Sequence, residues 1–115
     1  MIGIDTASIS RVTCDIKSGG ILGFFTNSEK EYCEGKPRPF ESYAGILCAK
    51  NAVKKALQKE QNIALSDIEI AHEPSGAPYV LLGGKAAVGI SVSISHDGDM
   101  AVAVAVYEPT AQKNV

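Results

Sequence analysis

The stretch from residue 92 to residue 106 constrains the fold of this 115-residue chain more than any other. Apolar and polar residues alternate over 92–96, and a second alternating stretch runs over 100–106. A two-residue period is the pattern of strands that are buried on one face. Between the two stretches, Asp97-Gly98 is a strong signal for a tight turn. The pattern predicts an antiparallel hairpin whose first strand ends at His96.

One long helix is expected over residues 41–59. At about 100° per residue, small and apolar side chains cover a broad face of this helix. They are Ala44, Ile46, Cys48, Ala49, Ala52, Val53 and Ala56. The remaining band carries Lys50, Asn51, Lys54 and Lys55. Because the apolar side chains are mostly small, the helix should pack closely against its neighbours.

Shorter elements are expected on both sides of this helix. Residues 1–4 form a short strand that ends at Asp5, and Thr6 or Ser8 caps a helix that Gly19-Gly20 ends. Thr26 and Glu29 have the spacing of a capping box. Pro37 and Pro39 mark a loop.

The part after the long helix reads as strands. Alternation predicts a strand over 67–73, a turn over 74–78 and a return strand over 79–82, and Gly83-Gly84 breaks the chain before the last hairpin. The fold class is therefore α+β: a small antiparallel sheet packed with one long helix and shorter helices. We expect one domain over 1–109 and a flexible tail over 110–115.

Composition limits the class of partner. The net charge of −2 argues against a nucleic-acid binder, which would show a basic excess. No apolar run is long enough to cross a bilayer, so no membrane partner is expected.

The three cysteines suggest a reducing compartment. Cys14, Cys33 and Cys48 contain no Cys-x-x-Cys pair and make no zinc pattern with His72 or His96. Their odd number and the lack of a signal segment favour reduced thiols and a cytoplasmic location. Cys48 is expected to pack as a small apolar residue.

Three groups of residues are candidates for chemistry. Asp5, directly after an apolar strand, can bind Mg²⁺ or cap the following helix. Asn51 and Lys55 are one helical turn apart, so they can hold a pyrophosphate together with a metal ion, or they can belong to a solvated face. His96 at a strand end can reach a ligand, or it can be a solvated surface residue. Ser95 points to the opposite face of the strand, so it forms no nucleophile pair with His96.

Four motifs, in order along the chain, resemble those of the holo-acyl-carrier-protein synthases. The opening resembles the family over residues 1–5, 9–12 and 25–29. The helix over 43–56 resembles its Ala-Lys-Glu-Ala helix, residues 76–79 its Gly-Lys-Pro hairpin, and residues 93–96 its histidine strand. Together these motifs span nearly the whole chain.

The resemblance implies an activity and roles for single residues. The family transfers 4′-phosphopantetheine from coenzyme A to a serine of an acyl carrier protein, using Mg²⁺. By resemblance, Asp5 and Asn51 are the metal ligands, while Lys55 contacts phosphate and His96 lies near the coenzyme. Lys55 and His96 are thus the catalytic and coenzyme-binding candidates. Arg11 is implied to dock the acidic carrier protein, and short family members are homotrimers with active sites between subunits.

Three positions depart from the family pattern. Asn51 stands where the family has a glutamate, and Ile46 where it usually has an arginine. Residues 57–60 replace a Phe-Gly-Thr-Gly turn. An amide oxygen can coordinate Mg²⁺ but adds no negative charge. Two functions follow: phosphopantetheinyl transfer, or binding of coenzyme A or a carrier protein by a non-catalytic relative or assembly module.

Overall fold

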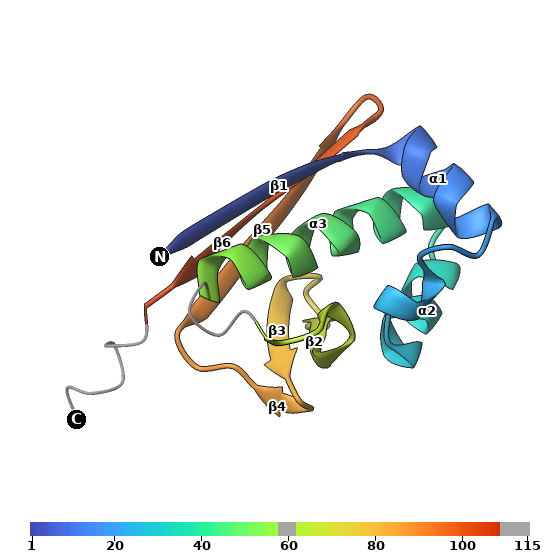
Figure 1. Ribbon diagram of the computed structural model, residues 1–115. Coiled ribbons are helices and arrows are strands. Elements are labelled where there is room, and N and C mark those ends of the chain that lie inside the picture. The colour runs from blue at the N-terminus through green and yellow to red at the C-terminus, as the bar shows by residue number, and fades with distance from the viewer. Residues whose placement is uncertain (58–61, 109–115) are drawn as a thin grey trace.

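The computed structural model describes residues 1–57 and 62–108 (Figure 1). The strands are β1 (Ile2–Ser8), β2 (Ile68–His72), β3 (Pro78–Leu82), β4 (Lys85–Ala86), β5 (Ile90–Asp97) and β6 (Met100–Tyr107). The α-helices are α1 (Ile9–Lys17), α2 (Asn27–Glu34) and α3 (Pro39–Leu57), and short 3₁₀ helices lie at Leu22–Phe24 and Leu65–Asp67. The predicted α+β class is confirmed, with the described strands divided between two antiparallel sheets.

The first sheet has the strand order β1-β6-β5, so the two ends of the described chain pair in it. The predicted hairpin is present as β5 and β6. Its turn is shifted by one residue from the prediction, because Asp97 still pairs with Met100 and the turn is Gly98-Asp99. Gly98 has a φ of 60°, a left-handed conformation that glycine adopts without steric cost.

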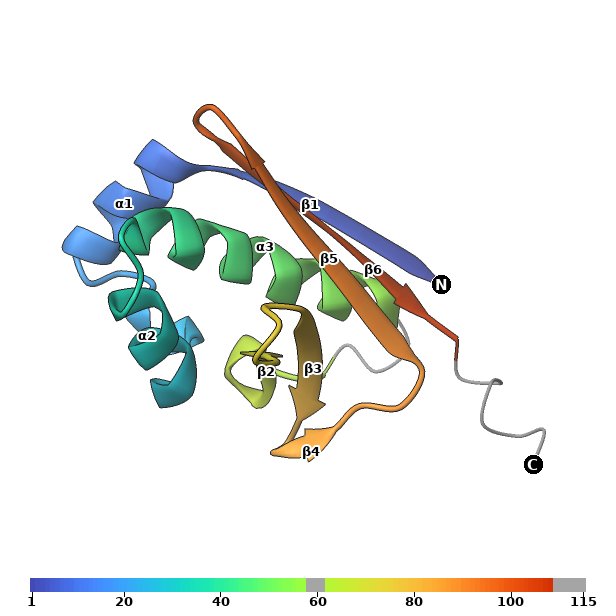
Figure 2. The same ribbon diagram turned by 180° about the vertical axis from the view of Figure 1, so that it is seen from behind.

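The second sheet has the order β2-β3-β4 and lies on the other side of α3 from β1 (Figures 1 and 2). The predicted strand pair is confirmed as β2 and β3. Sequence reasoning missed β4, in which Lys85 pairs with Leu82. Gly83 and Gly84 both have positive φ, which lets the chain turn back on itself instead of only breaking the strand.

Alternate residues of the first sheet face α3, which crosses the sheet (Figure 2). In one row, Asp5 pairs with Ala103, which pairs with Ile94. In the next row, Ala7 pairs with Ala101, which pairs with His96. Asp5 and His96 therefore share a face of the sheet but lie on opposite edge strands.

Small residues let α3 approach this face closely. A Cβ atom on Gly3 would overlap the carbonyl oxygen of Ala52. The predicted apolar face of α3 is confirmed as buried, and it meets the alanines of β6. Its members are Ala44, Ile46, Cys48, Ala49, Ala52, Val53 and Ala56, and the alanines are Ala101, Ala103 and Ala105. The close approach brings the polar side chains of α3 to the first strand.

The start of α1 corrects one prediction. The strand β1 does not end at Asp5 but continues to Ser8, whose hydroxyl oxygen accepts from the Arg11 backbone N–H at 3.2 Å. Asp5 and Thr6 are strand residues, so Ser8 is the cap and Asp5 is free for another role. The break at Gly19-Gly20 agrees with the end of α1 at Lys17.

The capping box at the start of α2 is confirmed. The Thr26 side chain accepts from the Glu29 N–H, and the Glu29 side chain accepts from the Thr26 N–H. Pro39 was expected in a loop but begins α3, where its missing N–H and fixed φ are tolerated. The predicted last residues of α3, 58 and 59, and the predicted tail lie outside the described residues.

The described helices include none that is long and apolar enough to cross a membrane. Within residues 1–57 and 62–108, no group of three or more His, Cys, Asp or Glu side chains is arranged to hold a metal ion. The cysteines Cys14, Cys33 and Cys48 are free thiols.

Candidate active site

Asp5, Asn51 and Lys55 lie together where β1 crosses α3. The Lys55 ammonium donates to Asp5 Oδ1 at 3.3 Å and to the Ile4 carbonyl oxygen at 2.9 Å. The Asn51 amide Nδ2 donates to Asp5 Oδ2 at 3.2 Å. Each carboxylate oxygen of Asp5 thus has one donor from α3. The Asp5 side chain is about one-fifth exposed, at 22%, so the cluster can be reached from solvent.

The charges of this cluster balance. Asp5 contributes one negative charge, Lys55 one positive charge and Asn51 none. A carboxylate and an amide are both oxygen ligands that Mg²⁺ accepts, but the amide must turn over to present its oxygen. The residues therefore fit a Mg²⁺ site only with help from a negatively charged ligand, because the protein alone offers no net negative charge.

A cavity of about 290 Å³ opens beside this cluster, between β1, α1 and α3. We call it the Asp5 cavity. Its lining includes Asp5, Asn51, Arg11 and Asp15. Arg11 is on the first turns of α1 and is exposed. The predicted docking residue and the two predicted metal ligands therefore border one space.

The β5–β6 turn holds the start of α1, and with it Arg11. Asp99 in this turn accepts from the Ser8 hydroxyl at 2.7 Å and from the Ser10 backbone N–H at 2.9 Å. These hydrogen bonds, first that of Ser8 and then those of Ser10, lower the pKa of Asp99. Sequence reasoning missed this contact because ninety residues separate its two ends.

His96 lies on the other side of α3, against Gly45. A Cβ atom on Gly45 would be 2.8 Å from His96 Nε2, so the glycine makes room for the ring. His96 Nε2 lies 3.0 Å from the Glu41 carbonyl oxygen. Because a carbonyl oxygen only accepts, Nε2 carries the proton and donates it. The other ring nitrogen, Nδ1, remains for a ligand.

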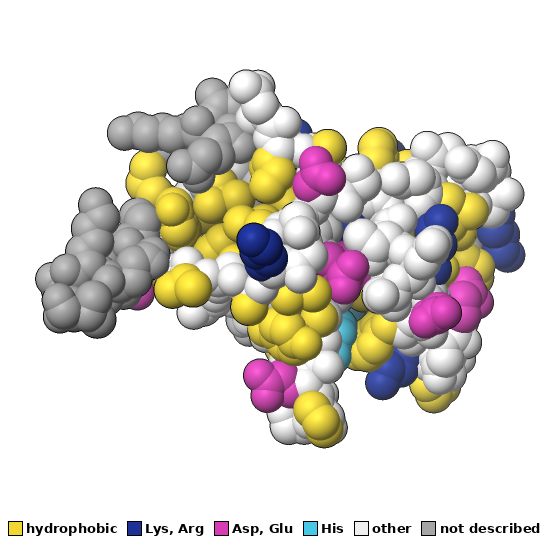
Figure 3. Space-filling view, turned by 90° about the horizontal axis from the view of Figure 1, so that it is seen from below, with side chains coloured by type: hydrophobic (Ala, Val, Ile, Leu, Met, Phe, Trp, Pro, Cys, Tyr) yellow, Lys and Arg dark blue, Asp and Glu magenta, His cyan; other side chains and the backbone are white. Residues whose placement is uncertain are grey.

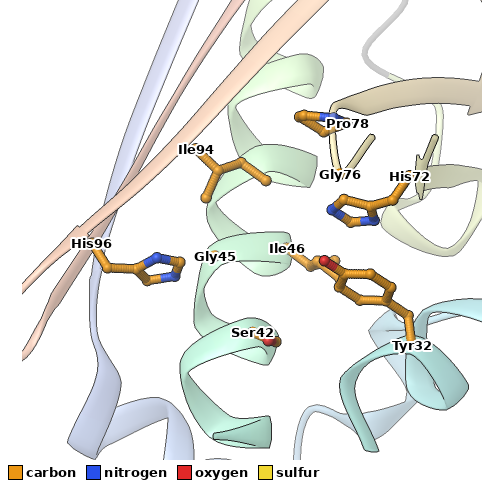
Figure 4. A pocket seen from close by; sticks show the side chains of 9 residues that line it. All are labelled: Tyr32, Ser42, Gly45, Ile46, His72, Gly76, Pro78, Ile94 and His96. Atoms are coloured by element: carbon orange, nitrogen blue, oxygen red, sulfur yellow. The ribbon is translucent and has the colours of Figure 1, made fainter. Parts of the chain in front are cut away.

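His96 borders a second cavity, of about 180 Å³ (Figure 4). We call it the His96 cavity. It is lined by Tyr32, Ser42, Gly45, Ile46, His72, Gly76, Pro78, Ile94 and His96. These residues come from α2, α3, β2, β3, the turn between these two strands, and β5. The lining has no residue in common with that of the Asp5 cavity, because α3 stands between the two.

The predicted polar band of α3 is wrong at Lys50. Its side chain is fully buried, and its ammonium donates to Glu29 Oε1 and to the Phe24 carbonyl oxygen, both at 2.6 Å. Glu29 Oε2 accepts from the Ile70 N–H at 2.7 Å. Burial lowers the pKa of Lys50, and Glu29 opposes this shift. One buried carboxylate thus joins α2, α3 and β2.

A sequence signal for the burial of Lys50 existed. Ile46 is four residues before Lys50, and Val53 is three residues after it, so all three share one face of α3. Cys48 behaves as predicted. It is buried, and burial raises the pKa of its thiol to about 11, which is the behaviour of a packing residue.

Comparisons with known proteins place the chain in a family. The family model described as the 4′-phosphopantetheinyl transferase superfamily matches residues 1–105. The chain is 41% identical to the holo-[acyl-carrier-protein] synthase of Ruminiclostridium cellulolyticum, covering 92% of this chain and 90% of that protein. It is 40% identical to the fatty acid synthase subunit alpha of Schizosaccharomyces pombe, covering 90% of this chain but only 6% of that subunit.

Solved structures agree with this result. The holo-[acyl-carrier-protein] synthase of Helicobacter pylori in complex with coenzyme A has a TM-score of 0.78 and 34% identity, covering 94% of this chain and 100% of that one. The synthase of Bacillus anthracis in complex with CoA (3′,5′-ADP) has a TM-score of 0.77 and 29% identity, covering 93% of this chain and 94% of that one. The chain belongs to the 4′-phosphopantetheinyl transferase superfamily, as the sequence motifs predicted.

Proposed function

We propose that this chain transfers 4′-phosphopantetheine from coenzyme A to a serine of an acyl carrier protein. The observation that carries the proposal is the meeting of Asp5, Asn51 and Lys55 in a chain of this family. The relatives named as holo-[acyl-carrier-protein] synthases, and the solved ones with coenzyme A, support the same reaction. The chain spans about nine tenths of those bacterial synthases.

The reaction is a phosphoryl transfer. The serine Oγ attacks the β-phosphorus of coenzyme A, an O–P bond forms, and the bond to the bridging oxygen breaks to release 3′,5′-ADP. The serine proton passes to a water molecule. Such reactions depend on positioning and charge neutralisation. Lys55, about half exposed at 56%, would neutralise the phosphate oxygens while it remains paired with Asp5.

We keep Mg²⁺ as part of this proposal. Asp5 and Asn51 would hold it, with coenzyme phosphates supplying the missing negative charge. When bound, Mg²⁺ would supply positive charge that neutralises the coenzyme phosphates. Lys55 and Asn51 already hold both carboxylate oxygens of Asp5, so this carboxylate is oriented before any ligand arrives.

A homotrimer would unite the two cavities. The Asp5 cavity and the His96 cavity lie on opposite sides of α3, so coenzyme can touch both only where two copies meet. The face of the first sheet that points away from α3 supports such assembly. It carries Ile2 and Ile4, which are 69% and 56% exposed, beside Val102, Val104 and Val106. Exposed apolar faces of this kind mark interaction surfaces.

Arg11 would then receive the carrier protein at the mouth of the Asp5 cavity. An exposed arginine on a helix that the β5–β6 turn holds in place is suited to a surface with negative charge. The free cysteines support the predicted cytoplasmic location. We also keep one transferase-like domain over 1–109 as a proposal.

The alternative is a relative that binds but does not transfer. The neutral Asn51, hydrogen-bonded to Asp5, favours it because the cluster is already charge-balanced. Mass spectrometry of an apo carrier protein mixed with this chain, coenzyme A and Mg²⁺ separates the two. The proposal expects the carrier to gain one phosphopantetheine arm. If several carriers gain no mass while the chain still binds coenzyme A, the non-catalytic alternative is supported instead.

A further inference from the structure

One wall of the His96 cavity is a stack of two rings. The rings of Tyr32 and His72 lie 3.9 Å apart and are tilted by only 2°. The ammonium of Lys36 lies 4.7 Å from the centre of the Tyr32 ring. Tyr32 is on α2 and His72 is on β2. Two residues before His72, the backbone N–H of Ile70 donates to the buried Glu29 carboxylate. Tyr32 therefore packs on one face of the His72 ring, and the Glu29–Ile70 hydrogen bond holds the strand that carries His72.

The two nitrogens of His72 have different surroundings. Nδ1 is buried and has no hydrogen-bond partner in the described structure. Nε2 is not among the buried atoms that lack a partner, and none of the described hydrogen bonds uses it. Nε2 is therefore the nitrogen that remains accessible. Figure 4 shows the His72 and Tyr32 side chains directed toward the space beside Ile46.

This difference decides where the proton is. A buried N–H without an acceptor is costly, and a buried charge is costlier. Nδ1 is therefore unprotonated, and the neutral ring carries its hydrogen on Nε2. Burial, and then the charge of Lys36, lower the pKa of His72, which agrees with a neutral ring. His72 thus presents one fixed N–H donor at the cavity.

The His96 cavity has no permanently charged side chain in its lining. The residues that line it include no Lys, Arg, Asp or Glu. Its polar groups are the hydroxyls of Tyr32 and Ser42 and the imidazoles of His72 and His96. Figure 3 shows histidine surface in a recess beside hydrophobic side chains. Ile46, in place of the expected arginine, contributes to this lining.

We propose that His72 is a coenzyme-contacting residue, whose Nε2–H donates a hydrogen bond to an acceptor atom of the coenzyme in the His96 cavity. This inference rests on the proposed function, in which that cavity takes part of the coenzyme. Because the cavity lining has no Lys, Arg, Asp or Glu, we expect an uncharged part of the coenzyme there, and a contact that salt screens less than the contact between Lys55 and phosphate. His72 therefore contributes affinity that depends little on ionic strength.

Two variants separate the donor from the stack. His72→Phe keeps a ring against Tyr32 but removes the donor, and His72→Gln loses the stack but carries an amide N–H near the position of Nε2. Calorimetry with coenzyme A, on the full chain at low and high salt, measures affinity. We expect His72→Phe to lose about five- to tenfold at both salt concentrations, and His72→Gln to lose less. His72→Phe should unfold at no lower temperature, because it removes a buried nitrogen that has no partner.

A readout that needs no ligand tests the tautomer. The ¹⁵N chemical shifts of the His72 ring should show a neutral imidazole protonated on Nε2. A ring protonated on Nδ1, or a folded His72→Phe variant that binds coenzyme A as tightly as the wild type, would overturn the inference. In the second case wild-type binding still supports the proposed function. If the wild type binds no coenzyme A, both proposals fail together, and the two failures are thus distinguishable.

Discussion

The two sides of α3 are built on different principles. On the Asp5 side, ionised groups pair across the junction of β1 and α3, and the arginine of α1 adds a further charge. On the His96 side, the cavity lining has no Lys, Arg, Asp or Glu, and packing shapes the cavity through Gly45, the ring stack and the buried Lys50–Glu29 pair. One side of α3 is therefore organised to handle charge and the other to hold a shape.

This difference predicts that substitutions on the two sides affect stability and ligand binding differently. Substitutions on the His96 side that remove packing or leave a buried charge should lower the stability of the fold. Substitutions on the Asp5 side should change the binding of charged ligands and leave stability nearly unchanged. Four variants test this difference between the two sides of α3.

Lys50→Met should have the largest effect. It leaves the fully buried Glu29 carboxylate without its cation, and breaking a buried pair in this way costs about 3–5 kcal/mol of the free energy of unfolding. Urea unfolding measures it. Glu29→Gln combined with Lys50→Met should lose less than the sum of the single variants. Additive losses would show that the pair is not a unit.

Gly45→Ala should come next. The added methyl group meets the His96 ring and the Ile94 side chain, and overpacking of this kind costs about 1–3 kcal/mol. Displacing His96 should also weaken coenzyme A binding. Mg²⁺ binding in the presence of inorganic pyrophosphate should stay unchanged, because the Asp5 cluster is on the other side of α3. If Gly45→Ala weakens both coenzyme A binding and Mg²⁺ binding, the two sides of α3 are not independent.

Asn51→Glu tests the Asp5 side. The wild type should bind Mg²⁺ detectably only when coenzyme A or inorganic pyrophosphate supplies negative charge, because Asp5 and Lys55 balance each other. A second carboxylate should raise Mg²⁺ affinity by about tenfold, with little change in stability. Calorimetry with and without coenzyme A decides it. If the variant binds Mg²⁺ no better than wild type, Asn51 is not at a metal site.

Arg11→Glu should have the smallest effect. We expect a loss of carrier-protein affinity of about several-fold at low salt, which shrinks as salt screens the contact. Coenzyme A affinity should not change. Arg38→Glu, which reverses an exposed charge just before α3 and outside the lining of the Asp5 cavity, is the matched control. Equal carrier affinity in wild type and Arg11→Glu would remove the docking role.

The Asp5 side could be predicted from the sequence to a large extent. Asn51 and Lys55 are one helical turn apart, and an apolar strand precedes Asp5. Local sequence patterns therefore identify all three residues as candidates. The cap on α1 needed more than periodicity. It is Ser8, fixed by Asp99 from the far end of the chain, and local sequence could not separate it from Thr6.

The His96 side could be predicted only in part. The strand that ends at His96 follows from alternation, but the partners of the cavity are long-range. Forty residues separate Tyr32 from His72, and no spacing rule links them. Lys50 was assigned to the polar band because its charge outweighed its position between Ile46 and Val53. Only the fold reveals that Glu29 is there to receive it.

In the proposed homotrimer, the Asp5 side of one copy and the His96 side of another form one working site. Co-expression of Lys55→Ala with His96→Ala tests it most directly, with transfer measured by mass gain of an apo carrier protein. Each variant alone should transfer poorly. In mixed ring-shaped oligomers, about a quarter of the shared sites combine two intact sides, so about a quarter of wild-type activity should return. Activity no higher than that of the two variants measured separately would contradict the account.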